Sequence, residues 1–292
     1  MNASVWVTGA RPRTLAAAVA PVSVGTAVAA HLGAVVPLRA GLALVVSLAL
    51  QVGVNYANDY SDGVKGVDDN RKGPTRITAG GLASPAAVKR AAVAAFGVAS
   101  AAGIALGVIV NPWLIALGAL CVLAGILYSG GPKPYASAGM GEVMVLIFFG
   151  LVATAGSTYV HLKRVPLLAV AAAIPIGLLA CAILLVNNLR DVDSDAAANK
   201  RTLAVRIGPE RSRRLFRAVI LVTVVSVAAI SVAVPGALIA LAATPLAARP
   251  LRAVRPGATP VALVGALRAT ARLQLVLALL LSTGLAAPKL WG

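Results

Sequence analysis

Hydrophobic residues lie in long runs along this sequence, and seven of the runs contain no Asp, Glu, Lys or Arg. A helix of about 20 apolar residues crosses the hydrocarbon core of a bilayer, which is roughly 30 Å thick. The runs therefore predict helices that span a membrane. They cover residues 14–38, 40–58, 91–132, 143–162, 165–189, 218–248 and 273–288.

Two of these runs carry an internal break. The 42 residues of 91–132 are too many for one crossing, and Asn111-Pro112 supplies a turn near their middle. We expect two helices there. In 218–248, Pro235-Gly236 either kinks one helix or separates two short helices.

The distribution of basic residues decides between these two topologies, because Lys and Arg accumulate in cytoplasmic loops. Nine spans with a cytoplasmic N-terminus place 22 of the 26 basic residues inside, whereas a single span over 218–248 places 18 inside. The sequence therefore predicts an all-α, polytopic membrane protein with nine transmembrane helices and its C-terminus outside. The eighth span, about 236–248, is short.

No loop is long enough to hold a separate soluble domain, so residues 1–292 are expected to form one domain. The run 14–38 follows Arg11 and Arg13 as the apolar part of a signal peptide would. However, it is longer than the usual stretch of about 7–15 residues, and further spans follow it. We therefore expect a retained first helix in a multi-pass protein of the cell membrane.

The composition agrees with a lipid bilayer as the surrounding medium. Of the residues, 59% are hydrophobic and 12% are charged, against about 25% charged in soluble domains, which excludes an ordinary cytosolic enzyme and a disordered chain. The net charge of +17 does not indicate nucleic acid, since the basic residues alternate with uncharged runs. Cys121 and Cys181 lie inside apolar runs and are expected to be buried free thiols.

Acidic residues are rare and concentrated. Seven of the nine fall in two short segments, 55–69 and 187–195, each of which follows an apolar run on the predicted cytoplasmic side. Acids at helix ends can simply pair with nearby Lys and Arg, but a chain so poor in acid is not expected to gather them twice. The two segments are therefore the candidate site.

The spacing within the segments places their polar residues on helix faces. Asn58 and Asp62 are four residues apart, and Asn187, Asp191 and Asp195 continue the same interval, so each set is expected on one face of a helix that extends past its apolar part. Aligning Asn58 with Asn187 brings Asp62 onto Asp191, an offset of 129 residues. This predicts an internal repeat whose two acidic faces meet across a shared cavity.

Clustered carboxylate and amide oxygens, with no His or Cys beside them, favour Mg²⁺, which binds one or two carboxylates together with substrate phosphates. The adjoining loops are basic, and acids for a metal beside cations for phosphate oxygens describe a diphosphate site. At the end of an apolar bundle, the substrate would carry a long hydrocarbon tail. Mg²⁺ and arginine would stabilise a departing diphosphate, so that an allylic prenyl group could ionise. The basic loop residues are Lys65, Arg71, Lys72, Arg76, Arg190, Lys200, Arg201 and Arg206.

At these two segments the sequence resembles the UbiA superfamily of intramembrane prenyltransferases. The motif N-D-x-x-D of that superfamily is matched by Asn58 to Asp62, and its motif D-x-x-x-D by Asp191 to Asp195. Gly66 stands where the wider superfamily often has Asp. That form, NDYSDGxxGxDD, resembles the 1,4-dihydroxy-2-naphthoate polyprenyltransferases of menaquinone synthesis. The segments ARPRTL (10–15), YSGGPKP (128–134), GMGE (139–142) and NNLRDVDSD (187–195) support the match, which extends over about 10–208.

The resemblance implies nine transmembrane helices around a central cavity and dependence on Mg²⁺. It also implies transfer of a polyprenyl group from polyprenyl diphosphate to 1,4-dihydroxy-2-naphthoate with loss of the carboxylate, giving demethylmenaquinone. By position, Asn58, Asp62, Asp191 and Asp195 would be catalytic and would hold the metal, with Asp68 or Asp69 completing the first motif. Asp59 and Asn188 could orient these ligands. The remaining expected substrate contacts are Arg11, Arg13, Asn55, Lys65, Arg71, Lys72, Arg76, Tyr128, Lys133, Asn187, Arg190 and Lys200.

Several of these residues would also suit roles outside substrate binding. Arg11 and Arg13 suit the topology of the first span, and Tyr128 suits an aromatic belt at the membrane interface as well as a shield for a cation. Lys133 could meet either the diphosphate or the acceptor carboxylate. Glu142 either favours a helix N-terminus or acts in acceptor binding.

Two rival functions are weighed against this one. Another UbiA-type transferase could act on 4-hydroxybenzoate, homogentisate, haem or a phosphosugar, but the pattern from Gly66 to Arg76 argues against these acceptors. Intramembrane carboxylates can also mark an ion-coupled transporter. Here the acids cluster at one face, and no ionisable residue lies in mid-span to relay a proton across.

Overall fold

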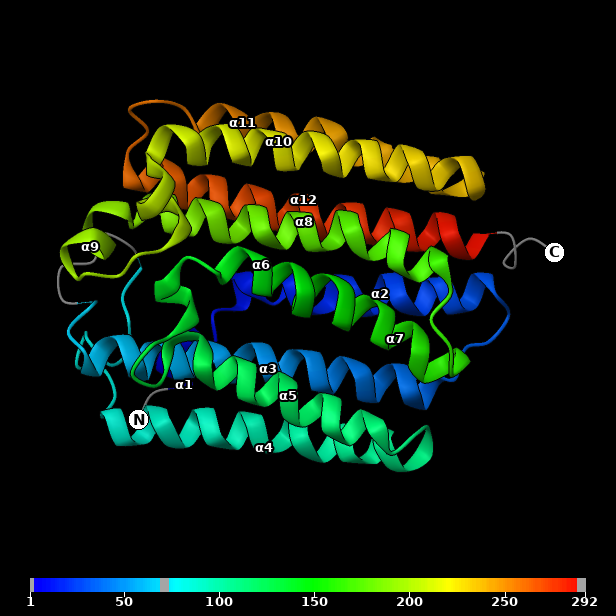
Figure 1. Ribbon diagram of the computed structural model, residues 1–292, viewed down its shortest axis with the longest axis horizontal. Coiled ribbons are helices and arrows are strands. Elements are labelled where there is room, and N and C mark those ends of the chain that lie inside the picture. The colour runs from blue at the N-terminus through cyan, green and yellow to red at the C-terminus, as the bar shows by residue number, and fades with distance from the viewer. Residues whose placement is uncertain (1–2, 69–73, 288–292) are drawn as a thin grey trace.

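The computed structural model describes residues 3–68 and 74–287, which form helices and contain no strand. The long helices run side by side along one axis (Figure 1). Six of the described helices are long and apolar enough to cross a membrane, and α1 with α2 forms a further pair bent by 50°. The predicted all-α, multi-pass architecture is confirmed at this level.

The first half of the chain contains five α-helices. Prolines open α3 and α4, where their fixed φ suits a helix start and the missing N–H needs no partner. Between α4 and α5 the chain turns at Asn111-Pro112, so the run 91–132 is two helices. The elements are α1 (Ala3–Ala10), η1 (Pro12–Thr14), α2 (Ala16–His31), α3 (Pro37–Val64), α4 (Pro85–Ile109) and α5 (Trp113–Ser129).

The middle of the chain contributes one composite span and one buried helix. The composite span consists of α6, η3 and α7. Its middle part, η3, is a π-helical stretch that carries Phe148 and Phe149. Such wide turns are rare overall, but where they do occur they often lie at functional sites. Helix α8 packs against α2, α10 and α12, and Ile176 and Leu179 are fully buried there. The elements are η2 (Tyr135–Ala138), α6 (Gly141–Val145), η3 (Leu146–Val152), α7 (Ala153–Leu162), α8 (Leu167–Arg190) and α9 (Val192–Ala197).

The last part of the chain contains the short predicted eighth span, and its helix type gives it enough length to cross a hydrocarbon core. The run 218–248 divides at Pro235, and the part after the break is a 3₁₀ helix of 13 residues. At a rise of about 2.0 Å per residue it extends about 26 Å, close to the thickness of a hydrocarbon core. The elements are α10 (Leu203–Ala233), η4 (Pro235–Ala247), α11 (Ala248–Ala253) and α12 (Pro260–Ala286).

Small residues fix η4 against its neighbours. Ala237, Ala240 and Ala243 recur every three residues, the period of a 3₁₀ helix, and each is 0% exposed. At Gly236 and Gly284 the backbones of η4 and α12 meet so closely that a Cβ atom on either glycine would collide with the other residue's backbone. Such close approach allows dispersion contacts between the two helices. These contacts matter because no hydrophobic effect drives helices together within lipid.

Both acidic segments lie at the same end of the bundle. The end of α3, the end of α8 and all of α9 gather at the left of Figure 1, as does α1, whereas α12 ends at the opposite side. Helix α3 has 28 residues and is therefore about 42 Å long at 1.5 Å per residue. Because this exceeds a hydrocarbon core of roughly 30 Å, its last two turns can extend into the polar region.

The packing of η4 makes a prediction about stability. Ala240→Leu should lower the unfolding temperature, because overpacking a tight interior typically costs about 1–3 kcal/mol. Ala242→Leu adds the same side chain at an exposed position of the same element and should change the unfolding temperature little. Thermal unfolding in detergent, followed by size-exclusion fluorescence, measures both. Equal losses for the two variants would contradict the buried period of three.

Candidate active site

A cavity of about 440 Å³ lies inside the bundle, and residues of both acidic segments line it at the part that we call its mouth. One face of α3 lines it with Gln51, Asn55, Asn58 and Asp62. Further along α3 the lining continues to Ala43, which is about 28 Å from Asp62 by helix rise. The deeper lining is apolar and includes Val46, Leu50, Leu117, Phe148 and Phe149. The cavity therefore has a polar mouth and a long apolar interior.

Asn55 ties the first residues of the chain to α3. Its amide nitrogen donates to the carbonyl oxygen of Ala10 at 2.9 Å and to the Thr14 hydroxyl at 3.0 Å, and its amide oxygen accepts from Gln51 at 3.2 Å. Arg11 donates to the Asn55 carbonyl oxygen at 3.4 Å and lines the cavity. Its backbone is left-handed, with φ 53°. Asn55 is therefore an anchor that aims Arg11 at the cavity mouth.

Asn58 and Asp62 lie one helical turn apart at the cavity wall, as their spacing predicts. Among the described residues, the side-chain oxygen of Asn58 is buried without a hydrogen-bond partner. Buried polar atoms are normally satisfied, so such an atom needs an explanation. An oxygen acceptor beside a carboxylate suits a hard cation, and the residues present fit Mg²⁺ in this respect.

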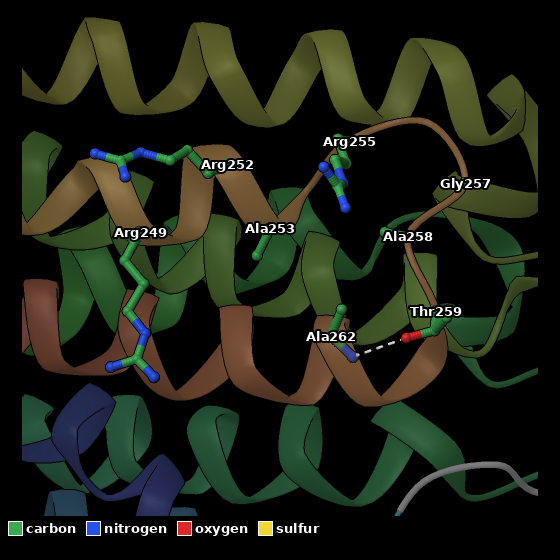
Figure 2. Close-up of a pocket in the computed structure, with 8 residues that line it drawn as sticks. All are labelled: Arg249, Arg252, Ala253, Arg255, Gly257, Ala258, Thr259 and Ala262. Atoms are coloured by element: carbon green, nitrogen blue, oxygen red, sulfur yellow. Dashed lines mark hydrogen bonds between the residues drawn. The ribbon is translucent and has the colours of Figure 1, made fainter.

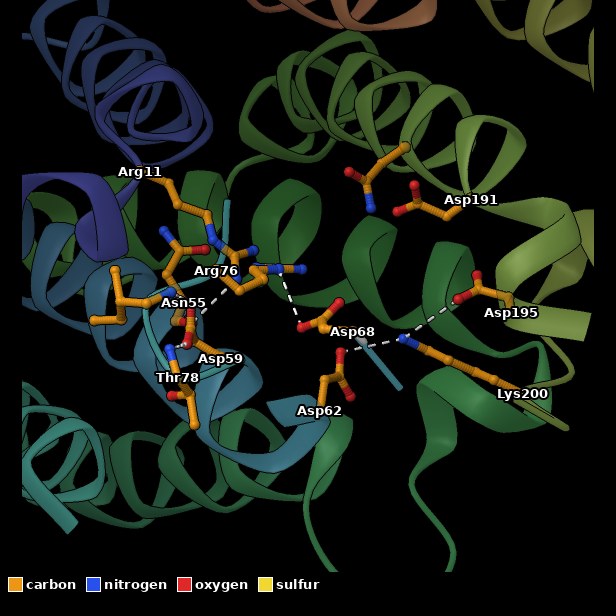
Figure 3. A network of polar contacts seen from close by, with 12 residues as sticks. Arg11, Asn55, Asp59, Asp62, Asp68, Arg76, Thr78, Asp191, Asp195 and Lys200 are labelled. Atoms are coloured by element: carbon orange, nitrogen blue, oxygen red, sulfur yellow. Dashed lines mark hydrogen bonds and ion pairs between the residues drawn. The ribbon is translucent and has the colours of Figure 1, made fainter. Parts of the chain in front are cut away.

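Asp59 faces away from the cavity. Its carboxylate accepts the backbone N–H groups of Ile77 at 3.1 Å and Thr78 at 2.8 Å, and the residue is 1% exposed. It therefore fastens the loop after α3 to the helix, which agrees with an orienting role and differs from the expected substrate contact. Arg76, from the same loop, lines the cavity and forms an ion pair with Asp68 at 3.3 Å (Figure 3).

Gly66 reverses the chain at the end of α3. Its φ of 69° is left-handed, and the N–H of Val67 bonds back to the carbonyl oxygen of Asp62 at 2.9 Å, the pattern that ends many helices at glycine. Glycine adopts this conformation without the steric cost that a Cβ atom brings. Asp68, beyond the reversal, is therefore the next described carboxylate of this segment, while Asp69 lies outside the described residues.

The second motif departs from the expected continuous helix. Helix α8 ends at Arg190, and the chain bends at Asp191 before α9 begins, although the N–H of Asp195 still bonds to the carbonyl oxygen of Asp191 at 2.8 Å. Despite the bend, Asn187, Asp191 and Asp195 all line the cavity. The expectation of one continuous helix is thus wrong, because α8 ends at Arg190, but the three residues do face the same cavity as predicted.

Arg190 holds the second motif from behind. Its guanidinium donates to both carboxylate oxygens of Asp191, at 2.7 and 2.6 Å, and to the side-chain oxygen of Asn187 at 2.8 Å. A bidentate arginine–carboxylate pair of this kind fixes orientation as well as charge. Arg190 does not line the cavity, so it positions the motif and is not placed to contact a substrate.

Lys200 joins the two motifs. Its ammonium lies 3.3 Å from a carboxylate oxygen of Asp62 and 3.9 Å from one of Asp195, and its side chain is 18% exposed (Figure 3). Asp62 and Asp195, one from each acidic segment, therefore meet at Lys200. Within 3–68 and 74–287, no three side chains of Asp, Glu, His or Cys are grouped closely enough to hold a metal. The lysine stands between the carboxylates that would form such a group.

Other expected site residues lie elsewhere. The ammonium of Lys65 donates to the carbonyl oxygens of Ser129 and Gly131, at 3.0 and 3.3 Å, which attaches it to the end of α5. Arg13 and Lys133 are exposed and do not line the cavity. The predictions for Arg71 and Lys72 fall outside the described residues.

Tyr135 and Gln51 are cavity residues that were not predicted as contacts, whereas Tyr128 and Asn188 were. Tyr135 packs edge-on against Tyr128 with ring centroids 5.4 Å apart, and both line the mouth. Burial raises the pKa of Tyr135 to about 12, so it stays a neutral phenol. Asn188 lines the cavity and donates to Glu142 at 2.9 Å, which links α8 to α6. Gln51, four residues before Asn55, could have been found from that interval.

A mouth lined by charged residues beside an apolar interior suits an anionic amphiphile, and comparisons with known proteins identify the family. The family description "UbiA prenyltransferase family" matches residues 18–256, so the chain belongs to the UbiA prenyltransferase family. This confirms the resemblance inferred from the two motifs. The 1,4-dihydroxy-2-naphthoate octaprenyltransferase of Mycobacterium tuberculosis is 50% identical over 220 residues, 75% of each chain. The enzyme of the same name from Escherichia coli is 37% identical over 227 residues, 75% of this chain and 74% of its own.

Solved structures share the fold. A UbiA homologue from Archaeoglobus fulgidus, solved bound to DMAPP and Mg²⁺, aligns over 95% of this chain and 99% of its own, with a TM-score of 0.65 and 17% identity. A homologue from Aeropyrum pernix aligns over 94% and 98%, with a TM-score of 0.67 and 16% identity. Identities this low establish the shared helical architecture only.

The reversal at Gly66 predicts a specific sensitivity. Gly66→Ala should lower the free energy of unfolding, because a left-handed conformation costs an L-residue about 1–2 kcal/mol. Gly97→Ala, inside α4 where a Cβ atom meets nothing within 4 Å, should be neutral or stabilising, because glycine in a helix interior costs about 0.5–1 kcal/mol relative to alanine. Unfolding temperatures of the two variants test the difference. A stable Gly66→Ala protein would contradict the reversal.

Proposed function

We propose that this chain is an intramembrane prenyltransferase that moves a polyprenyl group from polyprenyl diphosphate to 1,4-dihydroxy-2-naphthoate. Loss of the acceptor carboxylate would give demethylmenaquinone and diphosphate. The observation that carries the proposal is the cavity, which combines a mouth lined by Asp62, Asp191, Arg11 and Lys200 with an apolar interior. From Asp62 to Ala43 its lining extends about 28 Å along α3. The acceptor is taken from the names of the relatives that are 50% and 37% identical.

We infer that Mg²⁺ would be held by Asn58, Asp62, Asp191 and Asp195, with Asp68 or Asp69 as a further ligand. When bound, the metal would neutralise diphosphate oxygens and so favour their departure. The free amide oxygen of Asn58 and the convergence of both motifs on Lys200 support this assignment. The homologue from Archaeoglobus fulgidus was solved with Mg²⁺ and DMAPP.

The chain's own residues would do the remaining work. Arg11, Arg76 and Lys200 bring positive charge to the mouth and would hold diphosphate oxygens. The apolar lining keeps water from a prenyl cation, which water would otherwise capture. Tyr128 lines the cavity with an aromatic ring, whose negative face would stabilise that cation.

We further propose nine crossings, with the N-terminus and the site toward the cytoplasm of a cell membrane, in one domain over 1–292. The positions of α1 and the end of α12 at opposite ends of the bundle suit an odd number of crossings. The length of η4 suits the short eighth span. The internal repeat between 55–69 and 187–195 belongs to this proposal.

A direct assay tests the proposed reaction. Purified protein with Mg²⁺ and a polyprenyl diphosphate should convert 1,4-dihydroxy-2-naphthoate to the decarboxylated, prenylated product, detected by mass spectrometry of extracted lipids. Parallel reactions with 4-hydroxybenzoate and homogentisate supply the matched controls. Prenylation of either control in preference to the naphthoate would overturn the acceptor, and no prenylation of any aromatic would overturn the transferase.

The position of Lys200 predicts how metal binding responds to its removal. With Lys200→Met, Asp62 and Asp195 lose the cation between them, so a divalent ion should bind more tightly before any diphosphate is added, by on the order of fivefold or more. Lys200→Arg should stay near the parent. Mn²⁺ titration followed by electron paramagnetic resonance measures the affinity without turnover.

The control is Lys89→Met, which removes a cation that lies over the Tyr60 ring and not beside a carboxylate. That variant should bind Mn²⁺ as the parent does. Unchanged or weaker Mn²⁺ binding by Lys200→Met would contradict the inference that the ammonium of Lys200 occupies the position of the divalent cation between the two motifs.

A further inference from the structure

Three arginines line a second pocket that is separate from the cavity. Arg249 and Arg252 belong to α11 and Arg255 to the loop that follows; with Ala253 and Thr259 they line a space of about 390 Å³ between α11 and the start of α12 (Figure 2). We call it the arginine pocket. No residue lines both this pocket and the cavity, so it is not part of the site described above.

The charge of the arginine pocket is not balanced by the protein. In the described part of the chain, no ion pair involves Arg249, Arg252 or Arg255. Between 203 and 286 the sequence has ten arginines and a single acid, Glu210. That acid already accepts from Arg213 at 2.7 Å. The described residues therefore supply no ion-pair partner to the arginine pocket, which leaves its guanidinium groups available to an external anion.

The surroundings indicate where that charge is carried. Arg249 directly follows the last residue of the uncharged run 218–248, so the pocket begins where the apolar surface ends. Val261, in the first turn of α12, is 80% exposed. A free anion in water makes no favourable contact with an adjoining apolar surface. A phospholipid, by contrast, carries an anionic phosphate next to its acyl chains and can contact both. Arginine is suited to that phosphate because its planar guanidinium can donate two parallel hydrogen bonds.

We propose that the arginine pocket binds the phosphate of an anionic phospholipid headgroup, with the acyl chains against the apolar surfaces of η4 and α12. The N-terminus of the 27-residue helix α12 adds a partial positive charge at the same place. The ligand chemistry is a phosphate diester with a net negative charge. Such a lipid would cover the apolar surface of η4 and α12 near the point where η4 ends.

The test uses the full chain in a neutral detergent. Dioleoyl phosphatidylglycerol is titrated into the protein, and native mass spectrometry counts the bound lipid; dioleoyl phosphatidylcholine is the neutral comparison. The variant carries Arg249→Gln, Arg252→Gln and Arg255→Gln. The matched control carries Arg211→Gln, Arg214→Gln and Arg217→Gln, which removes the same charge from exposed positions on the neighbouring helix α10.

The pocket variant should weaken phosphatidylglycerol binding by on the order of tenfold or more, and the α10 control by less than about twofold. If the glutamine variant does not fold, the three arginines are changed to lysine, which keeps the charge but loses the paired hydrogen bonds and should still weaken binding at least about threefold. Equal losses in the pocket and control variants would overturn the proposal in favour of diffuse attraction. Displacement of the lipid by millimolar inorganic phosphate would overturn the lipid as the source of the anion.

Discussion

Carboxylates can gather at the end of an apolar bundle only where positive charge lies between them, since like charges repel strongly when partly withdrawn from water. That constraint governs this molecule. Lys200 lies between Asp62 and Asp195, and Arg190 forms an ion pair with Asp191. The polar mouth of the cavity is thus a balanced array, and a divalent cation would enter it by exchanging with a charge that the protein already supplies.

The rest of the fold holds this array above an apolar interior. Asn55 fastens the first residues of the chain to α3, and Asp59 fastens the loop after α3 to the same helix. Because both anchors lie on α3 close to Asp62, the arginines of those two segments are brought to the mouth together. The deeper lining of the cavity offers no charge. A long apolar tail with an anionic head is the molecule that matches both halves.

Features set by local chemistry could be predicted from the sequence. The break at Asn111-Pro112 depends on proline alone, and the shared face of Asn58 and Asp62 depends only on the helical period. The resemblance to the UbiA superfamily rested on such local motifs, and the family match confirms it. The threefold spacing of alanines in η4 was also present in the sequence and indicates 3₁₀ geometry once the period is recognised.

Features set by distant contacts could not be predicted in the same way. The sequence gives no sign that Lys65 binds the end of α5, or that the carboxylate of Asp59 accepts from backbone N–H groups 18 and 19 residues later. The bend at Asp191 likewise interrupts a pattern that reads as one continuous helix. Lys65 and Asp59 were both expected at the substrate, whereas tertiary packing assigns them to the scaffold.

The central claim is that the two motifs form one site around one leaving group. The most direct measurement is turnover of Asp62→Ala, Asp191→Ala and the double variant at saturating Mg²⁺. Each single change should cost on the order of 10²–10³ in rate, and the double change should be little worse than either, as for groups that act as a unit. Additive losses in free energy, as expected of independent sites, would contradict the claim.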